Sequence, residues 1–493
     1  MGRIVKEHII LAILFIIILA VRLLFAFHET GFSYDAYNAL RQTEHIKQTG
    51  LPLFKDPLSY SGRTIIFPPL FYYLLALFNL FIPLAFTAKI IPSLGFASLV
   101  LIIYFITKHI TKNKVAALIA AFFSGFVPII YTTINQVSVY SLALVLIFLL
   151  SYTFLRIEEK GFAVLSIILL ILALFTHTSV FTLLISFFIY FLILRLGKHR
   201  INIKEIEITL FLLFLALWFN ILLYKKAFFM HGIRFIWQNI PAPLLSSYFQ
   251  DISFLRVIYA VGIVPLLLGV YAIYHVFFKT RNRAASLYIS FAIVAFIMLW
   301  LKLIPFKTGL LFLSINLIIL SAYSLKIILV NASKTKIRAL PNIMTSLVIL
   351  IFILTTLTPF IKTIKPRTPP PQDIEALNWV RNNTPQDAVI LGSVKEGFLI
   401  NHIAKRKNVA DPNFLLINNI NQRYNDINHL FTLRLKSEAI RLLNKYAVDY
   451  IFLSTNSMKE YNLTKLFYAE EDCFELVYDN EALIYKFLGC RIE

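Results

Sequence analysis

The chain has 493 residues, of which 59% are hydrophobic and 15% are charged, and its formal net charge is +21. A water-soluble domain does not need so much apolar sequence, and repeated apolar runs near 20 residues predict a protein that crosses a membrane many times. The basic excess does not indicate nucleic-acid binding, because the lysines and arginines lie in short clusters between apolar runs, where they orient membrane helices.

The first apolar run, residues 9–27, has no small-residue cleavage site and is followed by further runs, so it predicts a retained anchor and not a signal peptide. In chain order the predicted spans are 9–27, 90–107, 114–131, 139–155, 161–176, 178–194, 208–224, 255–278, 284–301, 308–325 and 342–361. They predict a mainly α fold, a polytopic membrane helix bundle of about 11 spans.

Basic residues between the spans predict the orientation of the bundle. The clusters are Arg3/Lys6, Lys108/Lys112/Lys114, Arg156/Lys160, Arg195/Lys198/Arg200/Lys204, Lys279/Arg281/Arg283 and Lys326/Lys334/Lys336/Arg338. All of them fall on the cytoplasmic side if the N-terminus is cytoplasmic. We therefore expect a multi-pass protein of the cell membrane in which loops 28–89, 132–138, 225–254 and 302–307 and the C-terminal region are extracellular.

One apolar stretch is not counted as a span. Residues 68–83, PPLFYYLLALFNLFIP, are short and bounded by prolines. A full span here would put the cluster 108–114 on the outer side, so we expect a helix that lies in the outer interface or dips into it.

Asp35 is the sharpest functional candidate in the first external loop, 28–89. A carboxylate at the mouth of a membrane helix is costly to desolvate, which makes it a candidate functional group by default. It could act as a general base on a hydroxyl. The alternative is a solvated acid in the first turn of a helix.

Other polar residues accompany Asp35 in this loop. Tyr37 and Arg41 are expected on the same helix, and Asp56, Tyr60 and Arg63 form a second cluster, DPLSYSGR at 56–63. We treat all five as candidate substrate-binding residues. The alternative for the second cluster is a simple turn, which Asp-Pro commonly opens.

The later external loops supply cations. Arg234, Lys302 and Lys307 lie beside aromatic residues at the expected outer interface, where a cation can neutralise a lipid phosphate or diphosphate headgroup. We include them as candidate substrate-binding residues. The alternative is interfacial anchoring of the helices.

The composition changes after Lys365. PRTPPP at 366–371 predicts a stiff linker, and residues 366–493 predict an extracytoplasmic soluble α/β domain. Its expected elements are a helix at 373–382, a strand at 387–391, a helix at 438–445, a strand at 448–454 and a hairpin at 474–487 that turns at Asp479-Asn480. The two cysteines, Cys473 and Cys490, have no metal-type spacing.

The order of these parts resembles the GT-C superfamily of membrane glycosyltransferases. YDAYNALR, which contains Asp35, is similar to the corresponding motif of the archaeal oligosaccharyltransferase catalytic subunit. PPLFYYLLA at 68–76 is closer to the protein mannosyltransferases and the lipid A aminoarabinose transferases. The resemblance implies an inverting transfer of a sugar from a polyprenyl (dolichyl) phosphate donor to a lipid, glycan or protein acceptor at the outer membrane face, with Asp35 as the base.

The chain also departs from the pattern that the resemblance implies. The second external loop, YTTINQVSVYS at 131–141, has no carboxylate for a metal, and GSVKEG at 392–397 replaces the sequon-recognition motif of the oligosaccharyltransferases. We therefore expect a lipid-monophosphate sugar donor, assign no metal ligand, and leave a divalent Mg or Mn ion open. The alternatives are an oligosaccharyltransferase-like metal-dependent enzyme, a polysaccharide polymerase or ligase, an inactive family member, and a polyprenyl-lipid or glycan transporter or flippase.

Overall fold

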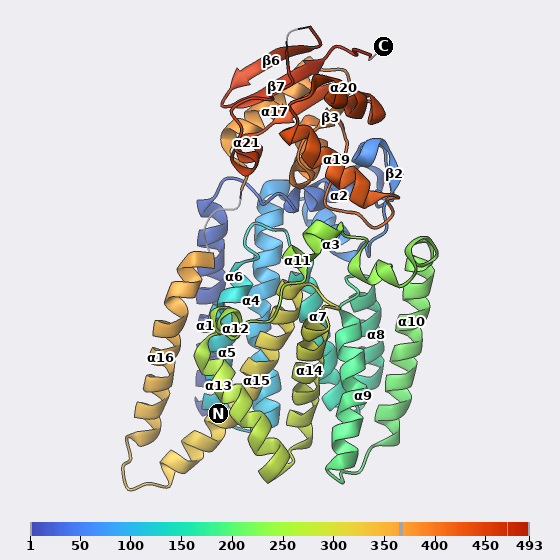
Figure 1. The fold of residues 1–493 in the computed structure, drawn as a ribbon. Helices are drawn as coiled ribbons and strands as arrows, with labels where there is room; N and C mark the ends of the chain where they lie inside the picture. Colours follow the sequence, from blue (N-terminus) through green and yellow to red (C-terminus); the bar gives the residue numbers. More distant parts are fainter. Residues whose placement is uncertain (1, 364–367, 471, 492–493) are drawn as a thin grey trace.

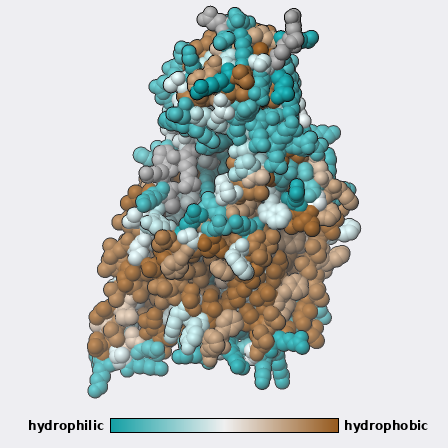
Figure 2. Space-filling view, viewed as in Figure 1, coloured by the Kyte–Doolittle hydropathy of each residue, from teal (hydrophilic) through white to brown (hydrophobic). Residues whose placement is uncertain are grey.

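The computed structural model describes residues 2–363, 368–470 and 472–491. A bundle of long helices stands below a smaller domain of helices and strands, and the two parts meet at the end of the bundle that carries the first predicted external loop (Figure 1). A broad band of hydrophobic residues covers the bundle, whereas hydrophilic residues cover the small domain and the opposite edge (Figure 2). This distribution is that of a membrane protein.

The bundle begins with α1 and ends with α16. Its helices are α1 (Gly2–His28), α4 (Leu84–Thr111), α5 (Lys114–Phe126), α6 (Pro128–Tyr131), α7 (Tyr140–Leu155), α8 (Phe162–Leu174), α9 (Val180–Leu196), α10 (Ile203–His231), α12 (Phe254–Val261), α13 (Ile263–His275), the π-helical turn η3 (Val276–Thr280), α14 (Arg283–Trp300), α15 (Phe306–Ser333) and α16 (Leu340–Thr363). Within the described residues, eight helices are long and apolar enough to cross a membrane, and α7, α8 and α9 are shorter apolar helices. The total of 11 spans stays a prediction.

Several predicted spans have different limits in the structure, and two of them are informative. The predicted span 255–278 is divided into α12 and α13 at Gly262, which has a φ of 86°. A positive φ interrupts a right-handed helix and is readily adopted by glycine. The predicted span 90–107 lies within the longer helix α4, which begins at Leu84, directly after Pro83.

Ion pairs show which loops share one face of the bundle. The Glu7 carboxylate near the start of α1 lies 2.6 Å from the Lys108 ammonium and 2.7 Å from that of Lys114. Arg283 likewise pairs with Glu205 at 2.7 Å. The loop 108–114 therefore lies at the same end of the bundle as the start of α1, and the starts of α10 and α14 lie together.

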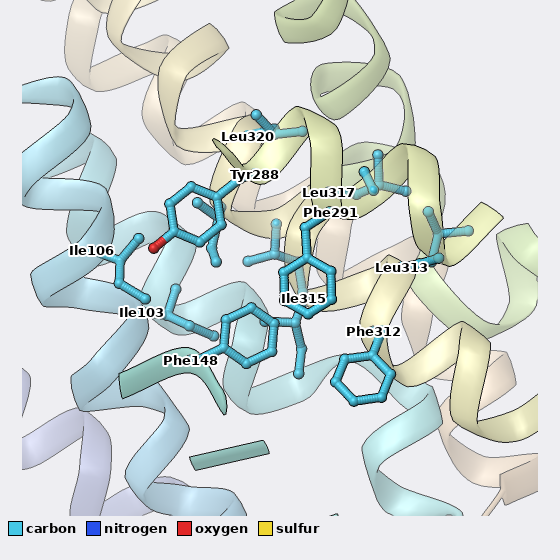
Figure 3. Packing of buried hydrophobic residues seen from close by; sticks show 14 of the residues in the cluster. Ile103, Ile106, Phe148, Tyr288, Phe291, Phe312, Leu313, Ile315, Leu317 and Leu320 are labelled. Carbon is cyan, nitrogen blue, oxygen red and sulfur yellow. The ribbon is translucent and has the colours of Figure 1, made fainter. Parts of the chain in front are cut away.

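The centre of the bundle is packed around α15, almost all of which is buried. Phe148 of α7 and Phe291 of α14 stack with ring centroids 5.5 Å apart, and Phe312 of α15 lies 5.6 Å from Phe291 (Figure 3). Aromatic and branched side chains fill the space between the helices. This packing fixes the ends of the helices on which the external loops are built.

Arg22 is the charged residue deep in α1, and two of its three guanidinium nitrogens have hydrogen-bond partners inside the protein. Its guanidinium donates to the carbonyl of Ile130 at 3.2 Å and to the hydroxyl of Thr133 at 3.3 Å, and it lies over the rings of Phe96 and Tyr131. Arg22 therefore makes structural contacts between α1 and the second external loop. A transporter mechanism that uses a charge within a span would have to break these contacts.

The first external loop contains α2 (Ala36–Thr49), β1 (Lys55–Asp56), the 3-10 turn η1 (Ser59–Ser61), β2 (Arg63–Thr64) and α3 (Leu70–Phe78). The helix expected over 68–83 is thus the nine-residue α3, which packs against α2 and lies near the junction of bundle and small domain (Figure 1). The loop 225–254 contains the end of α10, the 3-10 helix η2 (Gly232–Trp237) and α11 (Ala242–Tyr248).

The small domain contains a five-stranded sheet with the order β4-β3-β5-β7-β6. Its strands are β3 (Val389–Leu391), β4 (Lys407–Asn408), β5 (Tyr450–Leu453), β6 (Phe474–Asn480) and β7 (Ala482–Phe487). Strands β4, β3 and β5 are parallel, and β7 and β6 add an antiparallel hairpin. The helical elements are α17 (Pro371–Asn383), η4 (Val394–Glu396), α18 (Gly397–Leu399), η5 (Ile400–Ala404), α19 (Ile420–Thr432), α20 (Lys436–Lys445) and α21 (Thr455–Tyr461).

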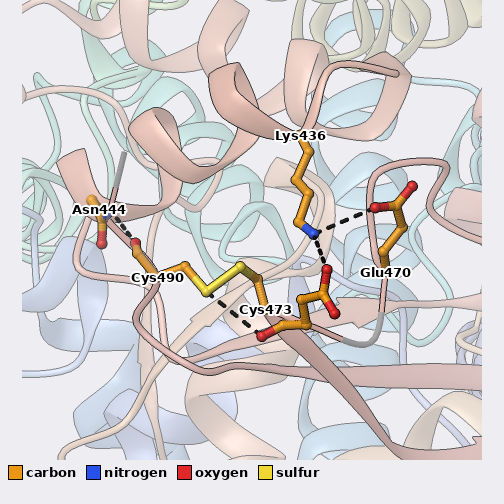
Figure 4. The surroundings of a disulfide bond; sticks show 6 residues. Lys436, Asn444, Glu470, Cys473 and Cys490 are labelled. Carbon is orange, nitrogen blue, oxygen red and sulfur yellow. Dashed lines mark hydrogen bonds and ion pairs between the residues drawn. A yellow bond between two sulfur atoms is a disulfide. The ribbon is translucent and has the colours of Figure 1, made fainter. Parts of the chain in front are cut away.

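All five elements expected in this domain are present, each within a few residues of its predicted limits, but the hairpin turns at Glu481, because Asp479 and Asn480 are paired residues of β6. The predicted linker 366–371 lies partly outside the described residues, because its first two positions are not among them. The domain also contains a feature that the sequence analysis did not predict, a disulfide between Cys473 and Cys490 (Figure 4). It ties the two ends of the β6–β7 hairpin together.

Candidate active site

Asp35 lies at the N-cap position of α2, immediately beyond the outer end of α1. Its carboxylate makes no capping hydrogen bond to the first turn of the helix. The residue is exposed, whereas the flanking Tyr34 and Ala36 are buried. The carboxylate is therefore accessible and does not cap α2, an arrangement that fits both a functional acid and the alternative of a solvated acid at the start of the helix.

The backbone around Asp35 is held by contacts from both parts of the protein. The amide of Ser33 donates to the carbonyl of Asn135 in the second external loop at 2.9 Å. The hydroxyl of Tyr34 accepts a hydrogen bond from the side-chain amide of Asn456, at the start of α21 in the small domain. These contacts fix the residues on which Asp35 is mounted.

Residues from three segments that are distant in sequence interact electrostatically with the Asp35 carboxylate. They are Lys307, Lys395 and Tyr248. Burial among protein atoms raises the pKa of Asp35, and the ammonium groups of Lys307 and Lys395 lower it. Tyr248 lies at the end of α11, and its pKa is raised to about 12. Burial is the main cause, and the negative charge of Asp35 contributes to the same shift. Asp35 is thus open to solvent while the surrounding protein disfavours its charged form and the two ammonium groups favour it.

Lys307 is the second residue of α15, at the outer end of that helix, and it is exposed. The N-cap is Pro305, which supplies no capping side chain. Unpaired amide groups and the helix dipole make such a helix end favourable for an anion. The next residue, Thr308, donates a hydrogen bond to the hydroxyl of Tyr140 at 2.8 Å. Lys307 thus combines a cation with a helix N-terminus beside Asp35.

Lys395 belongs to the segment 392–397, which was noted in the sequence only for its lack of a recognition motif. It lies in η4, directly after β3, and its ammonium is 4.6 Å from the centroid of the Tyr34 ring. Neither Lys395 nor Tyr248 was selected from the sequence. Nothing in the local pattern identifies them, because their proximity to Asp35 depends on how the small domain and α11 pack over the bundle.

Arg41, Asp56, Tyr60 and Arg63 are paired within the protein. Arg41 forms two hydrogen bonds with the Asp56 carboxylate, at 2.5 and 2.6 Å. The hydroxyl of Tyr60 donates to the carbonyl of Asp411 at 2.7 Å, and Arg63 forms an ion pair with the Asp411 carboxylate at 2.8 Å. The second cluster of the first loop therefore docks onto the small domain. That these four residues also bind substrate stays a prediction.

The other candidates lie in different surroundings. Tyr37 is buried, with its ring 5.5 Å from that of His402. Lys302 forms an exposed ion pair with Asp251 at 2.8 Å. Arg234 is exposed on η2, which packs against α10 on the side of the bundle away from α1 (Figure 1). Of the three predicted cations, Lys307 is the one that the structure places beside Asp35.

A cluster of metal-ligating side chains is not found among the described residues: no three His, Cys, Asp or Glu side chains are grouped there so that they could hold an ion. The second external loop offers the amide oxygen of Asn135, which is buried without a hydrogen-bond partner. Mg²⁺ is usually bound by one or two carboxylates together with substrate phosphates and water, so a divalent ion that arrives with the substrate stays a prediction.

Comparisons with solved structures identify the architecture. The chain superposes with a TM-score of 0.73 on the apo oligosaccharyltransferase of Archaeoglobus fulgidus, at 17% identity, over 95% of this chain and 72% of that one. It superposes with a TM-score of 0.56 on ArnT from Cupriavidus metallidurans bound to undecaprenyl phosphate, at 12% identity, over 98% of both chains. Both are GT-C superfamily glycosyltransferases. The chain has the GT-C fold.

A third GT-C structure adds a ligand-bound example. Archaeal oligosaccharyltransferase AglB from Archaeoglobus fulgidus, in complex with an inhibitory peptide and a dolichol-phosphate, matches with a TM-score of 0.71 and 16% identity over 92% of this chain and 70% of that one. No family model and no curated protein matches the sequence. At these identities the likeness establishes the GT-C fold, and the activity must be argued from the residues of the site.

Proposed function

We propose that this protein is a membrane glycosyltransferase that moves a sugar from a polyprenyl (dolichyl) phosphate to a lipid, glycan or protein acceptor, with Asp35 as the general base. The observation that carries the proposal is the accessible Asp35 carboxylate, on which the charges of Lys307 from the bundle and Lys395 from the small domain both act, in a GT-C fold. Solved structures with this fold contain dolichol-phosphate or undecaprenyl phosphate.

Lys307 is suited to hold the phosphate of the donor. It lies at the outer end of α15, where the isoprenoid chain of a donor can remain in the membrane while its phosphate reaches the helix N-terminus. A lysine ammonium at the N-terminal end of a helix stabilises a phosphate that gains charge as it leaves. Positioning of both substrates at one face of the membrane contributes to the rate as well.

The transfer is a direct displacement. The acceptor hydroxyl oxygen attacks the anomeric carbon, and the bond from that carbon to the phosphate oxygen breaks with its electron pair going to the phosphate. The hydroxyl proton goes to the Asp35 carboxylate. The raised pKa of Asp35 suits this role, since a base whose pKa is closer to the working pH takes up a proton more readily. A single displacement inverts the anomeric configuration.

We place the catalytic face and the small domain outside the cell, following the distribution of basic residues. The Cys473–Cys490 disulfide supports this orientation, because disulfides persist mainly in oxidising compartments. The N-terminus and the basic loops that share its face are then cytoplasmic.

The alternative that a specific observation favours is an oligosaccharyltransferase-like, metal-dependent enzyme. It rests on the TM-score of 0.73 with the Archaeoglobus protein. It requires a divalent ion, and the described residues around Asp35 offer few ligands for one. Dependence of turnover on added Mg²⁺ or Mn²⁺ separates it from the metal-independent transfer proposed above.

The experiment is a transfer assay in membranes with a panel of radiolabelled polyprenyl-phosphate sugars. It compares the wild type with Asp35→Asn, Asp35→Ala and, as a matched control, Glu44→Gln, an acid on the same helix. We expect a loss of about 10²–10⁴-fold for both Asp35 variants and near wild-type transfer for the control. Transfer at full rate by Asp35→Asn would exclude Asp35 as the base. Absence of transfer from every donor, with uptake of labelled lipid into the other leaflet, would favour a flippase.

A further inference from the structure

Lys395 is the cation that the small domain contributes beside Asp35. Its ammonium lies over the face of the Tyr34 ring, 4.6 Å from the centroid, and Tyr34 precedes Asp35 in the chain. The lysine is exposed, whereas the residues on either side of it, Val394 and Glu396, are buried. A cation–π contact restricts the position of the ammonium group, which would otherwise move freely in solvent.

The turn that carries Lys395 is fixed at both ends. The buried Glu396 carboxylate accepts hydrogen bonds from the amide of Ser393 at 3.0 Å and from the hydroxyls of Ser454 and Ser457. A Cβ atom added at Gly397 would lie 2.1 Å from the carbonyl oxygen of Ala410. Close backbone packing of this kind leaves the turn little freedom to move. The side chain that this fixed turn presents toward the site is a single lysine.

The charges of the proposed reaction need two cations near Asp35. Before transfer, the Asp35 carboxylate and the phosphodiester of a monophosphate donor each carry about one negative charge. After transfer, Asp35 is neutral and the released lipid phosphate approaches a charge of −2. The total therefore remains near −2 throughout. Lys307 supplies one positive charge from the bundle, and Lys395 supplies a second from the small domain.

We propose that Lys395 binds the phosphate of the lipid-linked donor, so that the small domain completes the donor site that the end of α15 begins. This inference rests on the proposed function and deepens it. It assigns the donor as a polyprenyl monophosphate sugar whose phosphate lies between the bundle and the small domain. It also explains why the segment between Gly392 and Gly397 is built as a fixed turn with an exposed lysine.

The test measures binding of unlabelled polyprenyl phosphate to the purified full-length protein in nanodiscs. The variants are Lys395→Ala, Lys395→Arg, Lys307→Ala and, as a matched control, Lys465→Ala, an exposed lysine of the same domain. We expect Lys395→Ala and Lys307→Ala each to weaken binding by about tenfold or more. Lys395→Arg should retain most of the affinity, and the control should bind as the wild type does. Binding of the uncharged polyprenol should not change in any variant.

Kinetics with the donor identified in the panel show whether Lys395 contacts the donor or the acceptor. A rise in KM for the donor, with KM for the acceptor unchanged, supports the assignment. An unchanged Kd for polyprenyl phosphate in Lys395→Ala, or a rise in the acceptor KM alone, overturns it and leaves the proposed function intact. If the wild type binds no polyprenyl phosphate and transfers no sugar, the proposed function itself fails.

Discussion

The guanidinium of Arg63 and the carboxylate of Asp411, 348 residues apart in the sequence, form a buried ion pair in which Nη2 lies 2.8 Å from Oδ1. The same guanidinium donates to the hydroxyl of Ser59 and to the carbonyl of Asn413. The first external loop, which also carries Asp35, is thereby joined to the small domain. The relative position of Asp35 and Lys395 depends on this junction.

Breaking this ion pair should loosen the small domain from the bundle. Arg63→Ala leaves the Asp411 carboxylate buried without its partner, and such a change typically costs about 3–5 kcal/mol. We expect a lower thermal unfolding midpoint and faster proteolytic cleavage between the two parts.

The control for this prediction is an exposed ion pair of the same domain, Lys445–Asp426, with a separation of 2.5 Å. Lys445→Ala should change stability by less than about 1 kcal/mol. Equal stability of Arg63→Ala and Lys445→Ala would mean that the Arg63–Asp411 pair does not hold the junction.

The sequence was sufficient for features that depend on local pattern. Charge clusters predicted which loops lie together, and the contacts of Glu7 with Lys108 and Lys114 agree with that prediction. Alternating apolar residues predicted β5 and the β6–β7 hairpin. Asp35 could be selected because a carboxylate directly after an apolar span is rare and costly.

The sequence was not sufficient for features that depend on long-range packing. The sequence suggested Asp56 and Arg63 as candidate substrate-binding residues of a loop. In the structure Asp56 is hydrogen-bonded to Arg41, and Arg63 forms an ion pair with Asp411. Nothing in the sequence distinguished Lys395 from the other lysines of the chain. Only the docking of the small domain over the bundle brings it to Tyr34, and no local period encodes that contact.

The pH dependence of transfer should report on Asp35. Burial raises its pKa above the ordinary value of 3.8, so the deprotonated form needed for catalysis is lost at a higher pH than for a solvated aspartate. Lys395→Ala removes a cation that lowers this pKa and should move the acidic limb of kcat/KM to higher pH. A pH-rate profile of both proteins checks this. A limb that stays in place would mean that Lys395 has no electrostatic access to Asp35.

The disulfide should stabilise the end of the small domain. Cys473 and Cys490 close a loop of 17 residues, and a loop of this size corresponds to about 3 kcal/mol in the chain-entropy model. The nearby Lys436 pairs with Glu470 and Asp472 at 3.4 and 3.3 Å but is partly exposed, so these pairs should contribute little (Figure 4). We expect Cys473→Ser/Cys490→Ser to lower the unfolding midpoint of the domain more than Lys436→Ala does. The reverse order, measured by thermal unfolding, would contradict the model.

Glu396 should make the stability of the small domain depend on pH near neutrality. Its burial raises its pKa from 4.5 to about 7, although three serines donate hydrogen bonds to it. Between these two values the folded protein holds a proton that the unfolded chain has released. The contribution of this proton is therefore fully present below about pH 4.5 and is lost as the pH rises toward 7. The difference of 2.5 between the two values corresponds to a change on the order of 3 kcal/mol.

Glu396→Gln tests this assignment, because glutamine preserves the size of the side chain and cannot titrate. We expect the unfolding midpoint of the wild type to fall as the pH is raised from 5 to 7, and the fall to be smaller in Glu396→Gln. The turn that carries Lys395 is built on this carboxylate, so the affinity for polyprenyl phosphate should follow the stability of the domain in the wild type. A wild-type stability that rises with pH over this range would show that the serine hydrogen bonds keep Glu396 ionised, and the turn would then be held by a carboxylate that is charged at every pH of the assay.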